Sequence, residues 1–376
     1  MENGRISVLL ADDVRDWRGG QRQVALLLEG LRERGIRCGA ACAEPSALLS
    51  YCRSQSVPAL ALPFKGEMDL VSAVRLAHQV KRRRIRILHA HSAHALGICL
   101  IAKIFIPGTV LVSTRHVTFS VRKRLWGAVK YNTRLLNGIV CVSDAVRQSL
   151  LKDGVDPRKL HVIHGGINVK RFLQSARAPR SDRRPQIPRG SLVVGTVAAF
   201  TAEKDYSNLF EAARIVLAKD SKVLFYAVGD GPDRARITRL VNDSGLADRF
   251  LFAETGSRSE DHMGSFGAFV LSSLNEGLGL SILEAQCLGL PVVATDVGGI
   301  PEIITAGRNG MLVPPGAPRA LARAILRLAG NARLRRELGR RGARSARQFS
   351  AERMVDRTVA LYRTLLDGQV AACVFH

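Results

Sequence analysis

The sequence predicts an α/β protein made of two Rossmann-like domains, each with a parallel sheet. Apolar runs of strand length alternate with helical patterns over most of the chain, and the alternation starts afresh after an irregular segment. The length of 376 residues suits two separate cores. Strand–helix–strand alternation implies parallel strands with right-handed crossovers. We therefore expect two such sheets facing each other across a cleft.

Two helical patterns lie in the first half of the chain. Residues 23–34 carry apolar side chains at helical spacing and end at Gly35, a helix stop signal. Residues 70–81 repeat the pattern, with apolar positions at Leu70, Val74, Ala77 and Val80. Apolar runs of strand length lie around these helices, at residues 6–11, 85–89, 109–113, 138–143 and 160–163.

A linker or mobile loop is predicted at residues 171–190, because residues 174–190 lack apolar periodicity and contain three prolines. It separates a first domain of residues 1–170 from a second domain of residues 191–350. The second domain begins its own alternation with runs at 192–198, 205–218 and 222–228. A last helical pattern, with Met354, Val355, Val359 and Tyr362 along one side, is assigned with residues 351–376 to the first domain.

The formal charge of +24 is large for this length and creates a field that attracts anionic partners. No helix-turn-helix, zinc-finger or RRM-like signature is visible, and aromatic residues are only 5%, so no nucleic acid is expected. An anionic membrane surface fits better. The alternative is an Arg-rich solvated surface with no single partner. The basic clusters are Lys81–Arg86, Arg122–Arg124, Arg177–Arg189 and Arg333–Arg347.

The predicted location is the cytoplasm, with peripheral attachment to the inner face of the cell membrane. The longest apolar stretch, residues 96–112, is broken by Lys103 and Pro107, so it predicts a buried helix and a strand rather than a membrane span. No N-terminal signal segment is apparent. Seven cysteines without Cys-x-x-Cys spacing indicate reduced thiols packed in the core.

The most informative segment is residues 275–288, a glycine-rich turn that leads into an apolar helix. Strand-like runs at 269–272 and 291–295 flank it and complete a βαβ unit. The turn of such a unit is where parallel sheets bind phosphorylated ligands. We expect the amides of Gly279, Leu280 and Ser281 to open the helix and face an anion.

Two carboxylates flank this anion site. Glu276 lies in the turn and Glu284 lies about 12 Å further along the helix. Hydrogen-bond acceptors on both sides of an anion suit a ligand with hydroxyls at each end of a diphosphate, such as a nucleotide sugar. Taken singly, Glu276 would cap the helix and Glu284 would be a solvated helix residue. The two glutamates together, in this strand–turn–helix unit, favour a ligand-binding site.

These motifs resemble glycosyltransferase family 4, whose members have the GT-B fold. The resemblance rests on N-E-G-L-G-L-S-I-L-E-A followed by G-L-P-V-V-A-T-D-V-G-G-I-P-E-I-I, and it extends from about Ile6 to Leu366 with the motifs in the family's order. It implies transfer of a sugar from a nucleotide diphosphate donor to an acceptor, with retention at the anomeric carbon. It also implies that the final helix crosses back to the first domain.

The resemblance assigns roles to residues of this chain. His116, in Ser-Thr-Arg-His-Val after a predicted strand, would lie beside the transferred sugar, and Glu276 would hold sugar hydroxyls; both are expected to be catalytic. By itself His116 would be a core histidine, and Gly19-Gly20 a turn. The expected donor-binding residues are Gly19, Gly20, Lys204, Gly277, Leu278, Gly279, Leu280, Ser281 and Glu284.

One position departs from the family pattern. The family has an Arg followed five positions later by a Lys, and both neutralise the diphosphate leaving group. Lys204 matches the Lys, whereas Ala199 stands at the Arg position, and Arg115 is one candidate to replace the missing charge. The turn Gly229-Asp-Gly-Pro232 resembles the family's G-x-G-P turn at the nucleotide pocket.

The His89-Ala-His91-Ser-Ala-His94 segment invites comparison with a metal site, but no carboxylate or cysteine ligand lies close in sequence. We expect these histidines to pack and form hydrogen bonds at the cleft wall instead. No Asp-x-Asp motif is present either. The sequence therefore implies no metal and no cofactor.

Two other functions fit parts of the sequence. One is a sugar-nucleotide epimerase of similar fold, and the other is a non-catalytic basic protein that binds membrane surfaces on a degenerate GT-B scaffold, which Ala199 favours. The Glu276 and Glu284 pair favours transfer. The predicted partners are a nucleotide-diphosphate sugar donor, a glycan or lipid-linked acceptor such as a cell-envelope intermediate, and an anionic membrane surface.

Overall fold

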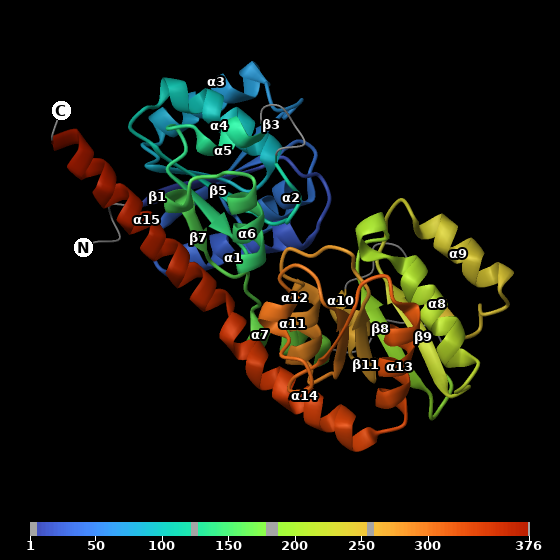
Figure 1. Ribbon diagram of the computed structural model, residues 1–376. Coiled ribbons are helices and arrows are strands. Elements are labelled where there is room, and N and C mark those ends of the chain that lie inside the picture. Colours follow the sequence, from blue (N-terminus) through green and yellow to red (C-terminus); the bar gives the residue numbers. More distant parts are fainter. Residues whose placement is uncertain (1–5, 122–126, 178–186, 254–258, 375–376) are drawn as a thin grey trace. The chain divides into compact units, whose positions relative to one another are not determined.

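Two units make up the chain in the computed structural model, which describes residues 6–121, 127–177, 187–253 and 259–374. Unit 1 holds Met1–Gly166 and Ala351–His376, and unit 2 holds Ile167–Ser350. Each unit has its own parallel sheet with helices packed on it (Figure 1). The predicted α/β fold with two Rossmann-like domains is confirmed.

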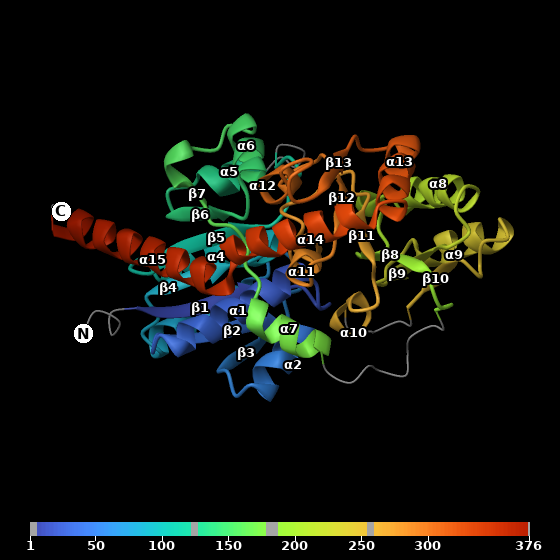
Figure 2. The same cartoon turned by 90° about the horizontal axis from the view of Figure 1, so that it is seen from below.

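A seven-stranded parallel sheet forms the centre of unit 1, in the order β3-β2-β1-β4-β5-β6-β7 (Figure 2). β1 lies between β2 and β4, so Leu9 is aligned with Gly39 on one side and with Leu88 on the other. The strand order therefore reverses at the β1–β4 boundary. The strands are β1 Ser7–Asp12, β2 Arg37–Ala43, β3 Ala59–Leu62, β4 Ile87–Ala90, β5 Val110–Arg115, β6 Gly138–Cys141 and β7 Leu160–Val162.

The helices of unit 1 cover this sheet and connect its strands. Their apolar sides meet the sheet in a core that includes Val8, Leu10 and Leu28, each with no exposed surface. The helices are α1 Gly19–Glu33, α2 Ala47–Ser54, α3 Leu70–Arg82, α4 Ala93–Phe105, α5 Gly127–Asn132, α6 Asp144–Lys152 and α15 Ala351–Val374, with a 3₁₀ turn at Pro157–Lys159.

The sequence does not predict β2 and β3. The β2 segment Arg-Cys-Gly-Ala-Ala-Cys-Ala has no β-branched or aromatic side chain, so its strand propensity is low. Every residue after Arg37 is nevertheless buried, because the strand pairs with β1 on one side and β3 on the other. Burial between two strands has overridden the local propensity.

The prediction for the packed face of α3 is partly wrong. Ala77 and Val80 are buried, but Leu70 and Val74 are 61% and 53% exposed. The helix is turned so that Ser72 faces inward, where its hydroxyl donates to Asp69 and accepts from the Phe64 amide. An apolar pattern alone does not reveal that a serine holds an inner position.

Unit 2 is built on a six-stranded parallel sheet in the order β10-β9-β8-β11-β12-β13 (Figure 2). Here the order reverses at the β8–β11 boundary, where Val194 is aligned with Phe225 of β9 and with Ala268 of β11. The strands are β8 Leu192–Val197, β9 Val223–Val228, β10 Phe250–Phe252, β11 Ala268–Leu271, β12 Val292–Thr295 and β13 Met311–Val313.

Among the helices of unit 2, α7 departs from the sequence prediction of a linker. Helix α7 takes up the first part of the segment assigned to a linker, because Asn168 accepts from the Arg171 amide and Phe172 is buried. Residues 178–186 of that segment lie outside the described residues. The helices are α7 Val169–Arg177, α8 Tyr206–Leu217, α9 Arg234–Asp243, α10 Ser259–Met263, α11 Leu280–Cys287, α12 Ile300–Ile303, α13 Pro318–Ala329 and α14 Ala332–Ala346, with 3₁₀ turns at Ala202–Lys204 and Arg347–Phe349.

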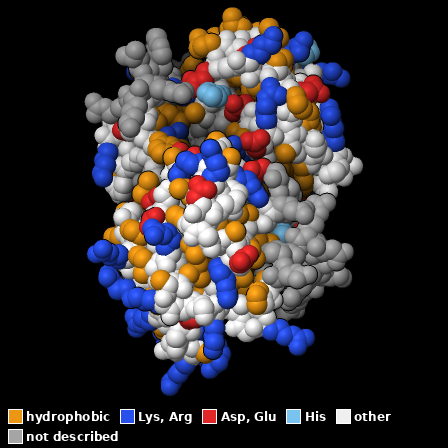
Figure 3. Space-filling view, turned by 90° about the vertical axis from the view of Figure 1, so that its right-hand side faces the viewer, with side chains coloured by type: hydrophobic (Ala, Val, Ile, Leu, Met, Phe, Trp, Pro, Cys, Tyr) orange, Lys and Arg blue, Asp and Glu red, His pale blue; other side chains and the backbone are white. Residues whose placement is uncertain are grey.

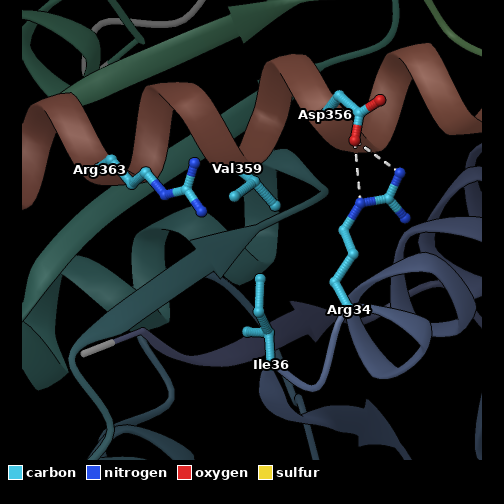
Figure 4. Close-up of a pocket in the computed structure, with 5 residues that line it drawn as sticks. All are labelled: Arg34, Ile36, Asp356, Val359 and Arg363. Carbon is cyan, nitrogen blue, oxygen red and sulfur yellow. Dashed lines mark hydrogen bonds and ion pairs between the residues drawn. The ribbon is translucent and has the colours of Figure 1, made fainter. Parts of the chain in front are cut away.

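The C-terminal helix α15 belongs to unit 1, as the resemblance implies, and packs along α1. Its predicted apolar side is buried through Met354, Val355, Val359 and Tyr362. At the edge of this contact Arg34 reaches Asp356, with Nη2 2.6 Å from Oδ1, beside a surface groove of about 380 Å³ (Figure 4).

None of the described helices combines the length and the hydrophobicity that crossing a membrane requires. The prediction that the cysteines pack in the core as free thiols is confirmed for the described side chains. These are Cys38, Cys42, Cys52, Cys99, Cys141 and Cys287, all buried and without a disulfide.

The contact between α1 and α15 is close enough to require glycine at position 30. A Cβ at Gly30 would lie 2.5 Å from Val355 Cγ2. We therefore predict that Gly30→Ala lowers the free energy of unfolding by about 1–3 kcal/mol, although alanine favours a helix interior. In a Val355→Ala background the same change should become neutral or stabilising in urea unfolding. Additive effects of the two substitutions would contradict this.

Candidate functional site

The candidate site in unit 2 lies at the β8–β11 boundary, where the strand order reverses. Ligands of open parallel sheets bind at such a point, beyond the carboxyl ends of the strands. The segment after β8 contains Lys204, and the segment after β11 contains Glu276. The fold thus brings together two predicted residues that are 72 positions apart in sequence.

Lys204 and Glu276 form an ion pair between Nζ and Oε1. Both side chains are largely shielded, with exposed fractions of 22% for Lys204 and 12% for Glu276. Ser273 Oγ donates a second hydrogen bond to the same carboxylate oxygen, at 3.1 Å. The sequence predicts separate roles for these two side chains, and the structure joins them.

Hydrogen bonds to the backbone fasten the two segments to each other. Ser272 Oγ lies 2.8 Å from the Lys204 carbonyl and donates to it, and the Leu274 amide donates to the Glu203 carbonyl at 2.8 Å. Asp205 follows in a left-handed conformation and caps α8 by accepting from the Asn208 amide. The position of Lys204 is therefore fixed by its own backbone as well as by its ion pair.

Gly298, which is not among the site residues predicted from the sequence, supports the Glu276 turn from the other side. A Cβ on Gly298 would lie 1.8 Å from the Glu276 carbonyl oxygen, and the residue has φ +54°. The next amide, of Gly299, donates to that carbonyl at 3.2 Å. The Val-Gly-Gly-Ile sequence in the quoted motif was the available signal.

Helix α11 starts at the same place without a side-chain cap. Its N-cap is Gly279, with φ 92°, so the simpler interpretation of Glu276 as the helix cap is wrong. Gly277 and Leu278 are buried in the turn, and Leu280 and Ser281 form the first helical turn at its half-buried start. The amides at this end are available to an anion.

Glu284 is only 5% exposed, so the alternative interpretation as a solvated helix residue is also wrong. It lies in the middle of α11, in a buried run that includes Leu283 and Ala285. A carboxylate in such surroundings requires polar partners.

The Ala199 position lies at the end of β8, beside the Gly229–Pro232 turn. A Cβ on Gly229 would lie 2.0 Å from the Ala198 carbonyl oxygen, so this turn packs closely on the strand end. Arg234 crosses the turn: Nη1 donates to the Gly229 carbonyl at 2.6 Å, and the guanidinium lies 5.5 Å from the centre of the Phe200 ring.

Arg115, the candidate replacement for the missing Arg, lies in unit 1. Its Nη2 donates to the Phe119 carbonyl at 2.7 Å, and its guanidinium stacks over Tyr131 at 5.8 Å from the ring centre. Its Nε is buried with no hydrogen-bond partner among the described residues.

In unit 1, His116 follows β5 and lies beside the start of α1. Gly19 and Gly20 are the first two residues of α1, so they form the start of the helix and not a separate turn. A Cβ on Gly20 would lie 3.9 Å from His116 Cδ2. The His116 ring is half-buried, and its Nε2 has no exposed surface and no partner among the described residues.

Two further histidines continue from His116 into the core. The His91 ring centre lies 6.0 Å from that of His116 and 4.2 Å from that of His89. His89 is satisfied, with Nδ1 2.6 Å from Tyr362 Oη and Nε2 2.7 Å from Thr114 Oγ1. His91 has neither nitrogen paired among the described residues, and a cavity of about 20 Å³ adjoins all three rings.

Burial makes these rings neutral at physiological pH. Burial, and to a smaller extent the charge of Arg115, lowers the pKa of His116 to about 4. Burial, and to a smaller extent repulsion from the protonated form of His116, lowers the pKa of His89 to about 3. His94 differs, because it is exposed and its Nδ1 lies 3.1 Å from Asp13 Oδ2. Among the described residues no group of His, Cys, Asp or Glu side chains is arranged to hold a metal ion.

Comparison with known proteins gives consistent matches for both units. The family profile described as Glycosyltransferase Family 4 matches residues 17–171, and the one described as Glycosyl transferases group 1 matches residues 178–345. The N-acetyl-alpha-D-glucosaminyl L-malate synthase of Bacillus anthracis is 27% identical over 310 residues, which is 79% of this chain and 80% of the relative.

Two further comparisons agree with these. The GDP-mannose-dependent alpha-mannosyltransferase of Mycobacterium tuberculosis is 32% identical over 228 residues, which is 60% of this chain and 56% of the relative. The crystal structure of Anabaena HepE with UDP and glucose has a TM-score of 0.83 at 20% identity, covering 96% of this chain and 100% of that one, and shows the same fold. From the profiles on both halves and the named relatives, the chain belongs to glycosyltransferase family 4 and is a glycosyltransferase with the GT-B fold.

Proposed function

We propose that this glycosyltransferase takes its sugar from a nucleotide diphosphate donor, with retention at the anomeric carbon. Its acceptor is a glycan or lipid-linked intermediate of the cell envelope. The observation that carries the donor proposal is the Lys204–Glu276 pair beside the uncapped start of α11. A cation, free amides and a carboxylate at one point match a diphosphate joined to a sugar.

Unit 2 is the donor domain in this proposal. Lys204 and the amides at Gly279, Leu280 and Ser281 bind the diphosphate, and stabilise the charge that develops as it leaves. Glu276 accepts hydrogen bonds from the sugar and Glu284 from the ribose. HepE was solved with UDP and glucose, and a relative is named GDP-mannose-dependent; both names support a nucleotide-linked sugar as the donor class.

The Lys204–Glu276 pair means that the diphosphate competes with a carboxylate for the lysine. In the free protein Glu276 neutralises Lys204. A bound diphosphate offers Lys204 a second anionic partner and frees Glu276 to accept from sugar hydroxyls. With Ala199 in place of the family's Arg, this lysine carries more of the leaving-group stabilisation.

Unit 1 is the acceptor domain, and His116 and the Gly19-Gly20 start of α1 are its residues that act on the transferred group. Since its pKa is lowered to about 4, the neutral His116 ring acts as a hydrogen-bond partner rather than as a cation. We place the protein in the cytoplasm at the inner face of the cell membrane, where its charge of +24 favours an anionic surface.

The test of the donor site is Glu276→Gln. We predict a fall in transfer rate of about 10²-fold or more in a protein that still folds, because the side chain lies in a turn outside the core and holds the reacting sugar. Glu211→Gln, at an exposed ion pair of α8, is the matched control and should transfer normally. The measurement is transfer or donor hydrolysis across a panel of nucleotide sugars. Rates for Glu276→Gln within a few-fold of wild type would remove Glu276 from the site.

Gly298→Ala tests the support of the Glu276 turn. The added methyl group would meet the Glu276 carbonyl, so we predict a loss of transfer of about 10²-fold through misplacement of the carboxylate. Gly316→Ala is the control, because Gly316 has a similar φ of +62° but open space around its Cβ position. Equal transfer rates for the two variants would show that the Gly298 contact does not position Glu276.

The buried histidines predict a pH dependence of stability. A histidine whose folded pKa is about 4 excludes a proton that the unfolded chain binds below about pH 6.5. The contribution of this histidine to the free energy of unfolding is therefore fully present above pH 6.5 and is lost as the pH falls toward 4. Urea unfolding at a series of pH values should show that the free energy of unfolding decreases less for His116→Gln than for wild type as the pH falls from 6.5 toward 4. An identical slope would mean that His116 titrates normally.

A further inference from the structure

The outer face of α3 is apolar at its N-terminal end. Leu70, Val71 and Val74 are 61%, 56% and 53% exposed, and Met68 just before the helix is 78% exposed. The inner face of the same helix packs through Leu76, Ala77 and Val80, among others. A surface helix ordinarily turns polar residues outward. The two sides of this helix end are thus both apolar, and only one of them is covered.

The same outer face becomes basic toward the C-terminus of α3. Arg75, Lys81 and Arg82 are exposed, and none of them forms an ion pair with a described residue. Arg83 and Arg84 follow directly and are exposed as well. We call Met68, Leu70, Val71, Val74, Arg75, Lys81 and Arg82 the α3 surface.

The nearest acidic residues are already engaged. Asp69 accepts from the Ser72 amide and hydroxyl and so caps α3. Glu67 pairs with Lys130, whose Nζ lies 3.1 Å from Glu67 Oε2. The α3 surface is therefore positive and apolar, without neutralising carboxylates. Two copies of it would repel each other, which argues against a dimer through this face.

Two further exposed apolar side chains lie on neighbouring helices. Val129 of α5 is 61% exposed and is brought near by the Lys130–Glu67 pair. Ile104, at the C-terminal end of α4, is 64% exposed and lies toward the basic end of α3, because α4 packs along α3 and both helices start at the carboxyl ends of the strands. Figure 3 shows apolar and basic side chains together at the end of unit 1 where Figure 1 places α3.

The apolar end of α3 lies on the same edge of the unit 1 sheet as His116. α3 follows β3, so its start lies beyond the carboxyl ends of the parallel strands, where the segments after β1 and β5 also lie. A chain of contacts supports this position: His94 pairs with Asp13 after β1 and lies 3.6 Å from Glu67 before α3.

We propose that the α3 surface inserts its apolar end into the headgroup region of an anionic bilayer, while its basic end contacts lipid phosphates. Apolar residues beside unpaired basic ones are typical of helices that lie in a membrane interface. The inference rests on the membrane partner of the proposed function and deepens it by naming the surface and by adding insertion to charge attraction. Attachment there holds the His116 edge of unit 1 near lipid-linked acceptors.

The test uses the full chain and vesicles of phosphatidylglycerol mixed with phosphatidylcholine, against pure phosphatidylcholine. Wild type should sediment with the anionic vesicles and keep part of its binding in high salt, because insertion is not screened. Leu70→Ser, Val71→Ser and Val74→Ser together should weaken binding about tenfold or more and make the remainder salt-sensitive. Arg75→Gln, Lys81→Gln and Arg82→Gln together should abolish the preference for anionic lipid.

Matched controls come from exposed residues of unit 2. Arg323→Gln, Arg327→Gln and Arg336→Gln remove the same charge elsewhere, and Leu240→Ser removes an exposed apolar side chain; both should bind vesicles like wild type. A Met68→Trp variant should show a blue-shifted emission with anionic vesicles only.

Three results would overturn the proposal. The first is that the triple serine variant binds anionic vesicles as tightly as wild type does. The second is that wild type does not bind anionic vesicles, and the third is that light scattering shows a wild-type dimer that the triple serine variant does not form. UDP binding, measured on the same samples, separates this failure from failure of the donor site. Loss of vesicle binding with intact UDP binding would overturn the membrane surface and leave the donor site standing, and the reverse would overturn the donor site alone.

Discussion

The ion pair between Lys204 and Glu276 is the interaction on which the arrangement of the unit 2 site depends. It joins the segment after β8 to the segment after β11, at the point where the strand order reverses. The hydrogen bonds from Ser272 and Leu274 hold the same two segments together through the backbone. The close fit of Gly298 under the Glu276 carbonyl leaves the turn little freedom. The Lys204 and Glu276 side chains are thus held close together in the free protein.

This arrangement has a chemical consequence for the proposed function. A lysine that is already neutralised by a carboxylate binds a diphosphate only by exchanging or sharing its partner, so donor binding and the release of Glu276 are coupled. Glu276 then becomes an acceptor for the sugar. In unit 1 the corresponding edge carries neutral rings, since burial lowers the pKa of His116 and His89. Positive charge for the leaving group is therefore supplied by unit 2 in this account.

Much of the fold could be predicted from patterns in the sequence. Strands rich in branched side chains and amphipathic helices such as α15 can be recognised from their own local sequence. β2 did not, since its alanines and cysteines become a strand only by burial between two neighbours. The motif predicted that Glu276 and Lys204 share a site, but their direct pairing depends on how two loops meet. The exposure of Leu70 and Val74 depends on the inward hydroxyl of Ser72, and the role of Gly298 on a contact with Glu276 that no local pattern contains.

The measurement that tests the central claim most directly is calorimetric titration of UDP into wild type, Lys204→Met, Glu276→Gln and the double variant. If the diphosphate competes with Glu276 for Lys204, Lys204→Met should weaken UDP binding by about tenfold or more, as the loss of a charge-assisted contact does. Glu276→Gln should bind UDP as tightly as wild type or more tightly, although its transfer rate is much lower. An equal loss of UDP affinity in the two single variants would contradict the account, because Glu276 would then support the diphosphate instead of competing with it.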